Sequence, residues 1–107
     1  CFDHIMKLMK QREIIKKIEE NREIVRSFGV KEITLVGSYA KDQQSKDSDI
    51  DFVVEFEEGR GLFDDYVHLT QFLRKLCKKK VDIGDKHLIR EELRALIMRG
   101  KKIEAKI

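Results

Sequence analysis

Asp49 and Asp51 stand two positions apart at the start of an apolar run, DIDFVVEF. If this run is a strand, both side chains leave the same face, with about 7 Å between the two residues along the backbone. A buried carboxylate without a partner is costly, so two of them in an apolar run argue for a ligand. Hard divalent ions such as Mg²⁺ bind a few carboxylates together with substrate phosphates. The spacing therefore predicts a metal site; the alternative is that the aspartates cap a neighbouring element or occupy an exposed strand end.

Gly37 and Ser38 supply the second half of the pattern, because they follow the apolar residues Leu35 and Val36. A glycine-serine turn that leaves a buried strand offers free backbone N–H groups and a hydroxyl at a helix start, which is a place for phosphate. Asp49 follows Ser38 by eleven positions. A pair of divalent ions about 4 Å apart clamps both ends of an in-line displacement at phosphorus. These residues together indicate nucleotide-dependent phosphoryl chemistry.

A third aspartate, Asp82, is flanked by Val81 and Ile83 in a short strand-like segment, KVDIG. This repeats the costly placement of a carboxylate between apolar neighbours. Asp82 is therefore a further candidate for the site. The alternative is that it caps the turn at Gly84 and Asp85.

The elements that must position these residues are predicted from hydrophobic periodicity and from turn residues. Their alternation predicts an α/β (α+β) domain in which helices pack on a small mixed sheet. The expected order is an N-terminal helix at about 4–28, a strand at 31–36, a short helical segment at 39–43, a strand at 50–56, a helix at 64–79, a strand at 80–84 and a helix at 88–99.

Several details within these elements are also predicted. Gly29 is expected to end the first helix in the left-handed conformation. Arg60 lies in a glycine-rich turn and is expected to be a solvated loop arginine, with phosphate binding as the alternative. Lys101 is expected to begin a short tail. The buried face of the 64–79 helix is expected to hold Phe63, Tyr66, Leu69, Leu73 and Leu76.

Length and composition limit the remaining possibilities. The 107 residues suit one compact domain at 1–107, with its catalytic core at about 31–100. Charged residues make up 40% of the chain, and no apolar run approaches the roughly 20 residues that a bilayer requires, so no membrane span is expected. The net charge of +3 comes from 23 basic against 20 acidic residues, which is too balanced to indicate a nucleic-acid binder.

The two cysteines, Cys1 and Cys77, lie in no CxxC motif and no disulfide framework. No secretory leader is recognisable, which agrees with a reducing environment and predicts a cytoplasmic protein. Because the chain begins with Cys1 rather than Met, its N-terminus is expected to be trimmed or incompletely covered.

The motif GSYA at 37–40 followed by SDID at 48–51 resembles the signature of the polymerase β-like nucleotidyltransferase superfamily, and the small size resembles its minimal (MNT) branch. The resemblance covers about residues 32–100 and implies the polymerase β-like nucleotidyltransferase fold. The superfamily pattern continues with arginine and glycine, where this chain has Lys41 and Asp42. Since aspartate tolerates the left-handed conformation better than most residues, we expect the turn to survive and Asp42 to point to solvent.

The resemblance implies a role for each candidate residue. Gly37 and Ser38 would hold the triphosphate of ATP, Asp49 and Asp51 would bind two Mg²⁺ ions, and Asp82 would act as general base or third metal ligand. The implied reaction transfers AMP from ATP to an acceptor hydroxyl. Small members of this kind are antitoxins that adenylylate a tyrosine of a HEPN-type toxin, so the resemblance also implies a HEPN partner and a possible homo- or hetero-oligomer.

A competing hypothesis keeps the fold but not the reaction. In that interpretation Lys41 and Asp42 weaken catalysis, and the chain is a binding module that neutralises its partner by contact. Transfer of label from ATP to a co-purifying protein distinguishes the two hypotheses.

Overall fold

The computed structural model describes residues 10–45, 47–92, 95 and 99–107. These residues form a mixed sheet, as predicted; it has four strands, in the order β3-β2-β1-β4, whereas three were predicted. β1 runs antiparallel to both β2 and β4, whereas β2 and β3 are parallel. The strands are β1 (Val30–Val36), β2 (Ile50–Phe56), β3 (Val81–Asp85) and β4 (Ile103–Ala105).

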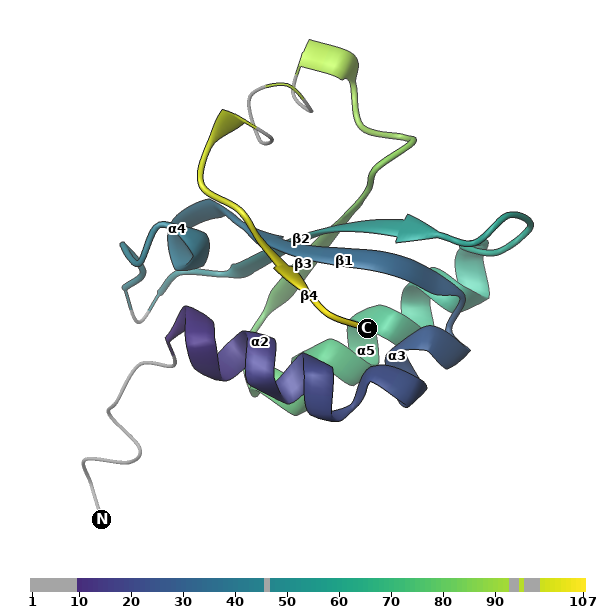
Figure 1. The fold of residues 1–107 in the computed structure, drawn as a ribbon, viewed down its shortest axis with the longest axis horizontal. Helices are drawn as coiled ribbons and strands as arrows, with labels where there is room; N and C mark the ends of the chain where they lie inside the picture. Colours follow the sequence, from purple (N-terminus) through teal and green to yellow (C-terminus); the bar gives the residue numbers. More distant parts are fainter. Residues whose placement is uncertain (1–9, 46, 93–94, 96–98) are drawn as a thin grey trace.

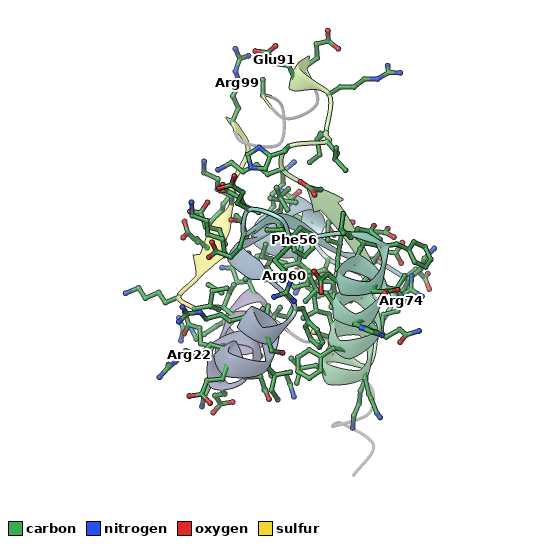
Figure 2. The ribbon with its side chains drawn as sticks, turned by 90° about the vertical axis from the view of Figure 1, so that its right-hand side faces the viewer. Arg22, Phe56, Arg60, Arg74, Glu91 and Arg99 are labelled. Atoms are coloured by element: carbon green, nitrogen blue, oxygen red, sulfur yellow. The ribbon has the colours of Figure 1, made fainter. Side chains whose placement is uncertain are left out.

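Three helices cover one face of this sheet: α2 (Gln11–Glu20), α3 (Arg22–Ser27) and α5 (Phe63–Cys77) (Figure 1). The four-residue helix α4 (Gly37–Ala40) follows β1 at one end of the sheet. The described residues that follow β3 rise above the opposite face, where Glu91 and Arg99 project away from the sheet (Figure 2). None of the helices in the described part of the chain is long and apolar enough to cross a membrane.

The core lies between the sheet and the helices, and alternate side chains of β2 point into it. Ile50, Phe52, Val54 and Phe56 belong to the core cluster, so the intervening side chains leave from the other face because successive strand residues point in opposite directions. We call this other side of the sheet the open face. Asp51 and Glu55 therefore lie on the open face, one near each end of β2.

α5 forms the crossover that parallel pairing of β2 and β3 requires. Its buried residues are Leu69, Leu73 and Cys77, so the predicted positions of Leu69 and Leu73 are confirmed. Phe63 and Tyr66, however, are 79% and 37% exposed. That part of the prediction is wrong, because helical periodicity defines a stripe along the whole helix whereas the sheet covers only part of it.

The N-terminal helical region contains a break that was not predicted. Asn21 has φ −114° and ψ 23° and separates α2 from α3. Its side-chain amide donates to the carbonyl oxygen of Lys17 at 2.8 Å. An asparagine side chain competes in this way for helix carbonyls, which explains the break. The first residues of the predicted helix, 4–9, lie outside the described residues.

Arg60 is not a freely solvated loop residue, which corrects a second prediction. Its guanidinium donates to both carboxylate oxygens of Asp65 and to the carbonyl oxygen of Ser27, each at 2.9 Å. Gly29, which has φ +85° as predicted, leaves the space that the Arg60 side chain occupies. Arg60 therefore ties the end of α3 to the start of α5, between which it lies in Figure 2.

The predicted tail from Lys101 is instead the edge strand β4. Ile103 pairs with Leu35, and Ala105 pairs with Ile33 and is almost fully buried. The alternation of Ile103, Ala105 and Ile107 was the sequence signal for this strand, since every second residue can then face the core. Of the predicted 88–99 helix, residues 91, 92, 95 and 99 are helical, and residues 93, 94 and 96–98 lie outside the described residues.

Candidate active site

Two of the predicted carboxylates are neighbours on the open face. Asp51 of β2 and Asp82 of β3 are partners in the parallel register, so their Cα atoms are about 5 Å apart, the spacing of adjacent strands. Asp51 is half-buried and Asp82 is exposed. Neither makes an ion pair with another described residue. The sheet thus places two carboxylates side by side without a cation between them.

The surroundings of Asp51 make its ionisation unfavourable. Burial raises the pKa of Asp51, and the negative charges of Asp82 and Asp49 raise it further. An opposite charge supplied by a ligand would reverse this effect. The electrostatics of the site therefore favour a bound cation.

Gly37 is the residue that lets the Asp51 side chain occupy its position. Its φ is +76°, and a Cβ atom placed there would lie 2.6 Å from Asp51 Oδ2. Any other residue would both strain the backbone and collide with the carboxylate. Strand pairing brings the two residues together, because Asp51 is opposite Val36, the last residue of β1.

A cleft of about 500 Å³ opens over this part of the open face. Lys41 and Lys101 contribute the cationic side chains of its lining, and Asp51 and Asp82 the anionic ones. Ile89 and Gly100 come from the chain between β3 and β4. The complete lining is Val36, Gly37, Lys41, Asp51, Phe52, Val53, Asp82, Ile83, Gly84, Ile89, Gly100 and Lys101.

The sequence matches the nucleotidyltransferase domain family over residues 8–106. The chain belongs to this family. A Methanocaldococcus jannaschii protein named "Putative protein adenylyltransferase MJ1379" is 38% identical to this nucleotidyltransferase in an alignment of 84 positions that covers 70% of this chain and 84% of that protein. Protein adenylyltransferase MntA of Thermococcus cleftensis is 32% identical over 78 residues, 73% of this chain and 78% of that protein.

Solved structures agree with this assignment. One described as "Structure of putative minimal nucleotidyltransferase" matches with a TM-score of 0.67 at 31% identity, covering 87% of this chain and 94% of that chain. A toxin-antitoxin crystal structure with AMP-PNP matches with a TM-score of 0.64 at 21% identity, covering 82% and 72% of the two chains, and shares the fold. The predicted family and fold are thereby confirmed.

Not all of the predicted site residues line the cleft of this nucleotidyltransferase. Asp49 immediately precedes β2, and its Oδ2 atom lies 3.9 Å from the ammonium of Lys80. It is nevertheless close enough to raise the pKa of Asp51. Ser38 is half-buried in α4, and its carbonyl oxygen accepts a hydrogen bond from the backbone N–H of Gln43 at 2.9 Å. The cleft thus brings together Gly37, Asp51 and Asp82, with Asp49 and Ser38 beside it.

The carboxylates fit a magnesium site in which the protein supplies only one or two of the ligands. No group of three or more His, Cys, Asp and Glu side chains within the described ranges is arranged to hold a metal. Mg²⁺ usually binds one or two carboxylates together with substrate phosphates and water rather than a closed protein cage. The uncompensated pair of Asp51 and Asp82 fits that mode. The predicted metal-binding roles of Asp49, Asp51 and Asp82 remain predictions.

Lys41 and Asp42, where the chain departs from the superfamily pattern, do not disturb the turn. Asp42 has φ +56° and is exposed, which confirms that it takes the left-handed conformation and points to solvent. Lys41 lines the cleft. A cation is thus present where the superfamily pattern has arginine.

Lys101 is a charged residue of the cleft that was not predicted from the sequence. It belongs to the segment that was expected to be a tail, and β4 instead returns this segment to the sheet. The alternation in β4 would have revealed the strand. Nothing local in the sequence connects Lys101 with the aspartates, because that proximity depends on pairing between β1 and β4.

Proposed function

We propose that this nucleotidyltransferase transfers AMP from Mg-ATP to a tyrosine hydroxyl of a HEPN-type toxin. The observation that carries the proposal is the pair of adjacent carboxylates, Asp51 and Asp82, without a cationic partner in a cleft that also presents two lysines. The names of the relatives support a protein acceptor, since two of them are called protein adenylyltransferases. The toxin-antitoxin structure with AMP-PNP supports ATP as substrate and a toxin as partner.

In this proposal, different residues in and beside the cleft bind different groups of the nucleotide. Gly37 and Ser38 would contact the triphosphate at the turn after β1, where backbone N–H groups are available. Lys41 and Lys101 would neutralise phosphate charge from the cleft lining. Two Mg²⁺ ions, held by Asp49 and Asp51, would supply charge neutralisation at the reacting phosphate and at the leaving pyrophosphate.

The proposed reaction forms a bond between the acceptor oxygen and the α-phosphorus. The bond from the α-phosphorus to the bridging oxygen breaks, and pyrophosphate leaves with its electron pair. Asp82 would take the proton of the hydroxyl as general base, because it is exposed and lies next to Asp51. Asp82 is also placed to serve instead as a third metal ligand.

The contact-only alternative is not favoured by the site. The two departures from the superfamily pattern leave the turn left-handed and keep a cationic side chain in the cleft, so neither removes a feature on which the proposed nucleotide binding depends. A cytoplasmic setting is part of the proposal, because ATP and Mg²⁺ are available there.

The test is transfer of labelled AMP from ATP to the partner protein that co-purifies with the chain. Asp51→Asn is expected to abolish labelling, because it removes charge that binds Mg²⁺. Glu23→Gln is the control, since it also removes one carboxylate, and Glu23 is exposed on α3 and lines neither the cleft nor the hollows beside the start of α5. Equal labelling by the Asp51 variant and the control would contradict the proposal.

A further inference from the structure

A group of exposed apolar side chains lies at the start of α5 and just after β3. In the described residues, large apolar side chains with high exposure are few, and Leu62, Phe63 and Leu88 are the most exposed of them, at 74%, 79% and 81%. Tyr66 is 37% exposed beside them. Phe63, Tyr66 and Leu88 line a common hollow of about 470 Å³, and Leu62 and Leu88 line the adjoining one. We call Leu62, Phe63, Tyr66 and Leu88 the α5 apolar patch.

The α5 apolar patch is continuous with the cleft that Asp51 and Asp82 line. Ile83, Gly84 and Ile89 line both the cleft and the hollow of the patch. Gly84 makes this possible, because a Cβ atom there would lie 3.0 Å from Cδ1 of Ile89. A molecule seated on the patch would therefore extend directly to the carboxylates of the cleft.

The edge of β3 next to the patch is not free for strand addition. The hydroxyl of Tyr66 donates to the carbonyl oxygen of Ile83 at 2.7 Å. The guanidinium of Arg74 donates to the carbonyl oxygen of Val81 at 3.5 Å. Since side chains of α5 already occupy these carbonyls, a partner must be recognised here through its side chains rather than through backbone pairing.

The rim of the patch is acidic. Glu57 and Glu58 line the hollow that Leu62 and Leu88 share, are exposed, and form no ion pair with another described residue. The cationic groups beside them are paired, Arg60 with Asp65 and Lys31 with Glu55. The chain as a whole carries a net charge of +3, so this local excess of negative charge is a property of the rim. An apolar centre with an acidic rim complements an apolar side chain flanked by basic ones.

We propose that the α5 apolar patch docks a segment of the acceptor protein in which an apolar side chain is flanked by lysine or arginine. Docking there sets the acceptor hydroxyl at the mouth of the cleft and so selects the substrate. This inference rests on the proposed function, because it assigns the patch to the acceptor of the same reaction.

The test uses two short synthetic peptides, each with one tyrosine next to leucine and phenylalanine. Lysines flank the apolar residues in the first peptide and glutamates in the second. The lysine peptide is expected to bind the whole chain about tenfold more tightly than the glutamate peptide at low salt. The double substitution Glu57→Lys with Glu58→Lys is expected to remove this preference.

Substitutions in the patch supply the second arm of the test. Phe63→Asp and, separately, Leu88→Asp are expected to lower the affinity for the lysine peptide about tenfold or more. Ile24→Asp is the matched control, because Ile24 is also an exposed apolar residue, at 44%, but lines a different hollow, formed by residues 19–24, that shares no residue with those of the patch. Circular dichroism of each variant establishes that it is folded.

The outcomes separate this inference from the proposed function. Equal affinity of the patch variants and the Ile24 variant, or no peptide binding by the unsubstituted chain, overturns the docking inference. Self-association that Phe63→Asp abolishes also overturns it, because a second copy would then be the occupant. Mg-ATP titration into the same proteins is independent of the patch, so a lack of nucleotide binding by the unsubstituted chain would instead overturn the proposed function.

Discussion

The open face of the sheet carries a cross-strand pair of carboxylates at each end, and their surroundings differ. Asp51 and Asp82 are partners between β2 and β3, and Glu32 and Glu55 are partners between β1 and β2. The glutamate pair is surrounded by cations, since Lys86 lies 3.5 Å from Glu32 and 3.6 Å from Glu55. Lys31 and His87 also contact Glu55. The aspartate pair has no such partner among the described residues.

The pKa shifts record the same difference. A hydrogen bond from Glu32 and the contacts of His87, Lys31 and Lys86 lower the pKa of Glu55, while the shared hydrogen bond raises the pKa of Glu32. The pKa of Asp51 is raised by burial and by neighbouring negative charge. Cationic side chains thus compensate the charge of the glutamate pair, whereas no described cationic side chain pairs with Asp51 or Asp82. The two carboxylate pairs therefore differ in whether their charge is free to attract a cation.

The largest expected effect is on the rate of AMP transfer and comes from changing the aspartate pair. Asp82→Asn should lower the rate of AMP transfer to the co-purifying partner by about 100-fold or more, the usual effect of removing a general base. Glu32→Gln removes a carboxylate from the other end and should leave the rate unchanged. Initial rates with labelled ATP measure both. Similar losses in the two variants would mean that the ends are not functionally distinct.

Gly37 offers a structural way to sharpen the comparison. Gly37→Ala should lower the free energy of unfolding by about 2–3 kcal/mol, because the left-handed backbone is strained and the new methyl group collides with Asp51. Gly59→Ala is the control, since Gly59 has φ +79° but nothing within 4 Å of the new methyl group. It should cost only about 1–2 kcal/mol. Urea unfolding gives both values, and equal costs would exclude a tight contact with Asp51.

Neutralising one carboxylate at each end should change stability in opposite directions. Without metal at neutral pH, Asp51→Asn should raise the free energy of unfolding by about 1 kcal/mol, because it removes an unfavourable charge. Glu55→Gln should lower it by up to about 1 kcal/mol, because its cationic partners lose their counter-charge. A loss of stability in the Asp51 variant without metal would indicate that this aspartate has a structural role.

The pH dependence follows from the directions of the shifts. The raised pKa of Asp51 means that the metal-free protein loses stability as pH rises from the ordinary value of 3.8 through the folded value. The lowered pKa of Glu55 contributes stability above its ordinary value of 4.5, which is lost as pH falls through the folded value. The advantage of Asp51→Asn should therefore grow with pH and then level off. Thermal unfolding between pH 3 and 7, in buffers without divalent ions, measures it.

The smallest expected effect concerns the turn beside the cleft. Asp42→Gly should tighten Mg-ATP binding by up to about 1 kcal/mol, the scale of a screened surface charge, because Asp42 is exposed and not part of the cleft lining. Isothermal titration with the two proteins decides the sign. Weaker binding by the glycine variant would show that Asp42 is itself a ligand.

The sequence predicted best what depends on local pattern. β2 was predicted at its observed bounds, and the motif SDID at 48–51 marked Asp49 and Asp51 at its start. The cationic surroundings of Glu55 were not predictable, because Lys31, Lys86 and His87 reach it from different segments. Lys101 was missed for the same reason. Periodicity also failed at Phe63 and Tyr66, where exposure depends on how far the sheet extends over α5.

Strand β4 has a consequence for the order of folding. Leu35 pairs with Ile103, across most of the length of the chain, so this pairing carries a larger loop-closure cost than the pairing of β1 with β2 or of β2 with β3. β4 is also the shortest strand and occupies an edge. It is therefore expected to form late and to open first in hydrogen exchange. Because Lys101 reaches the cleft only when β4 is paired, the proposed nucleotide site would be completed by the last step of folding.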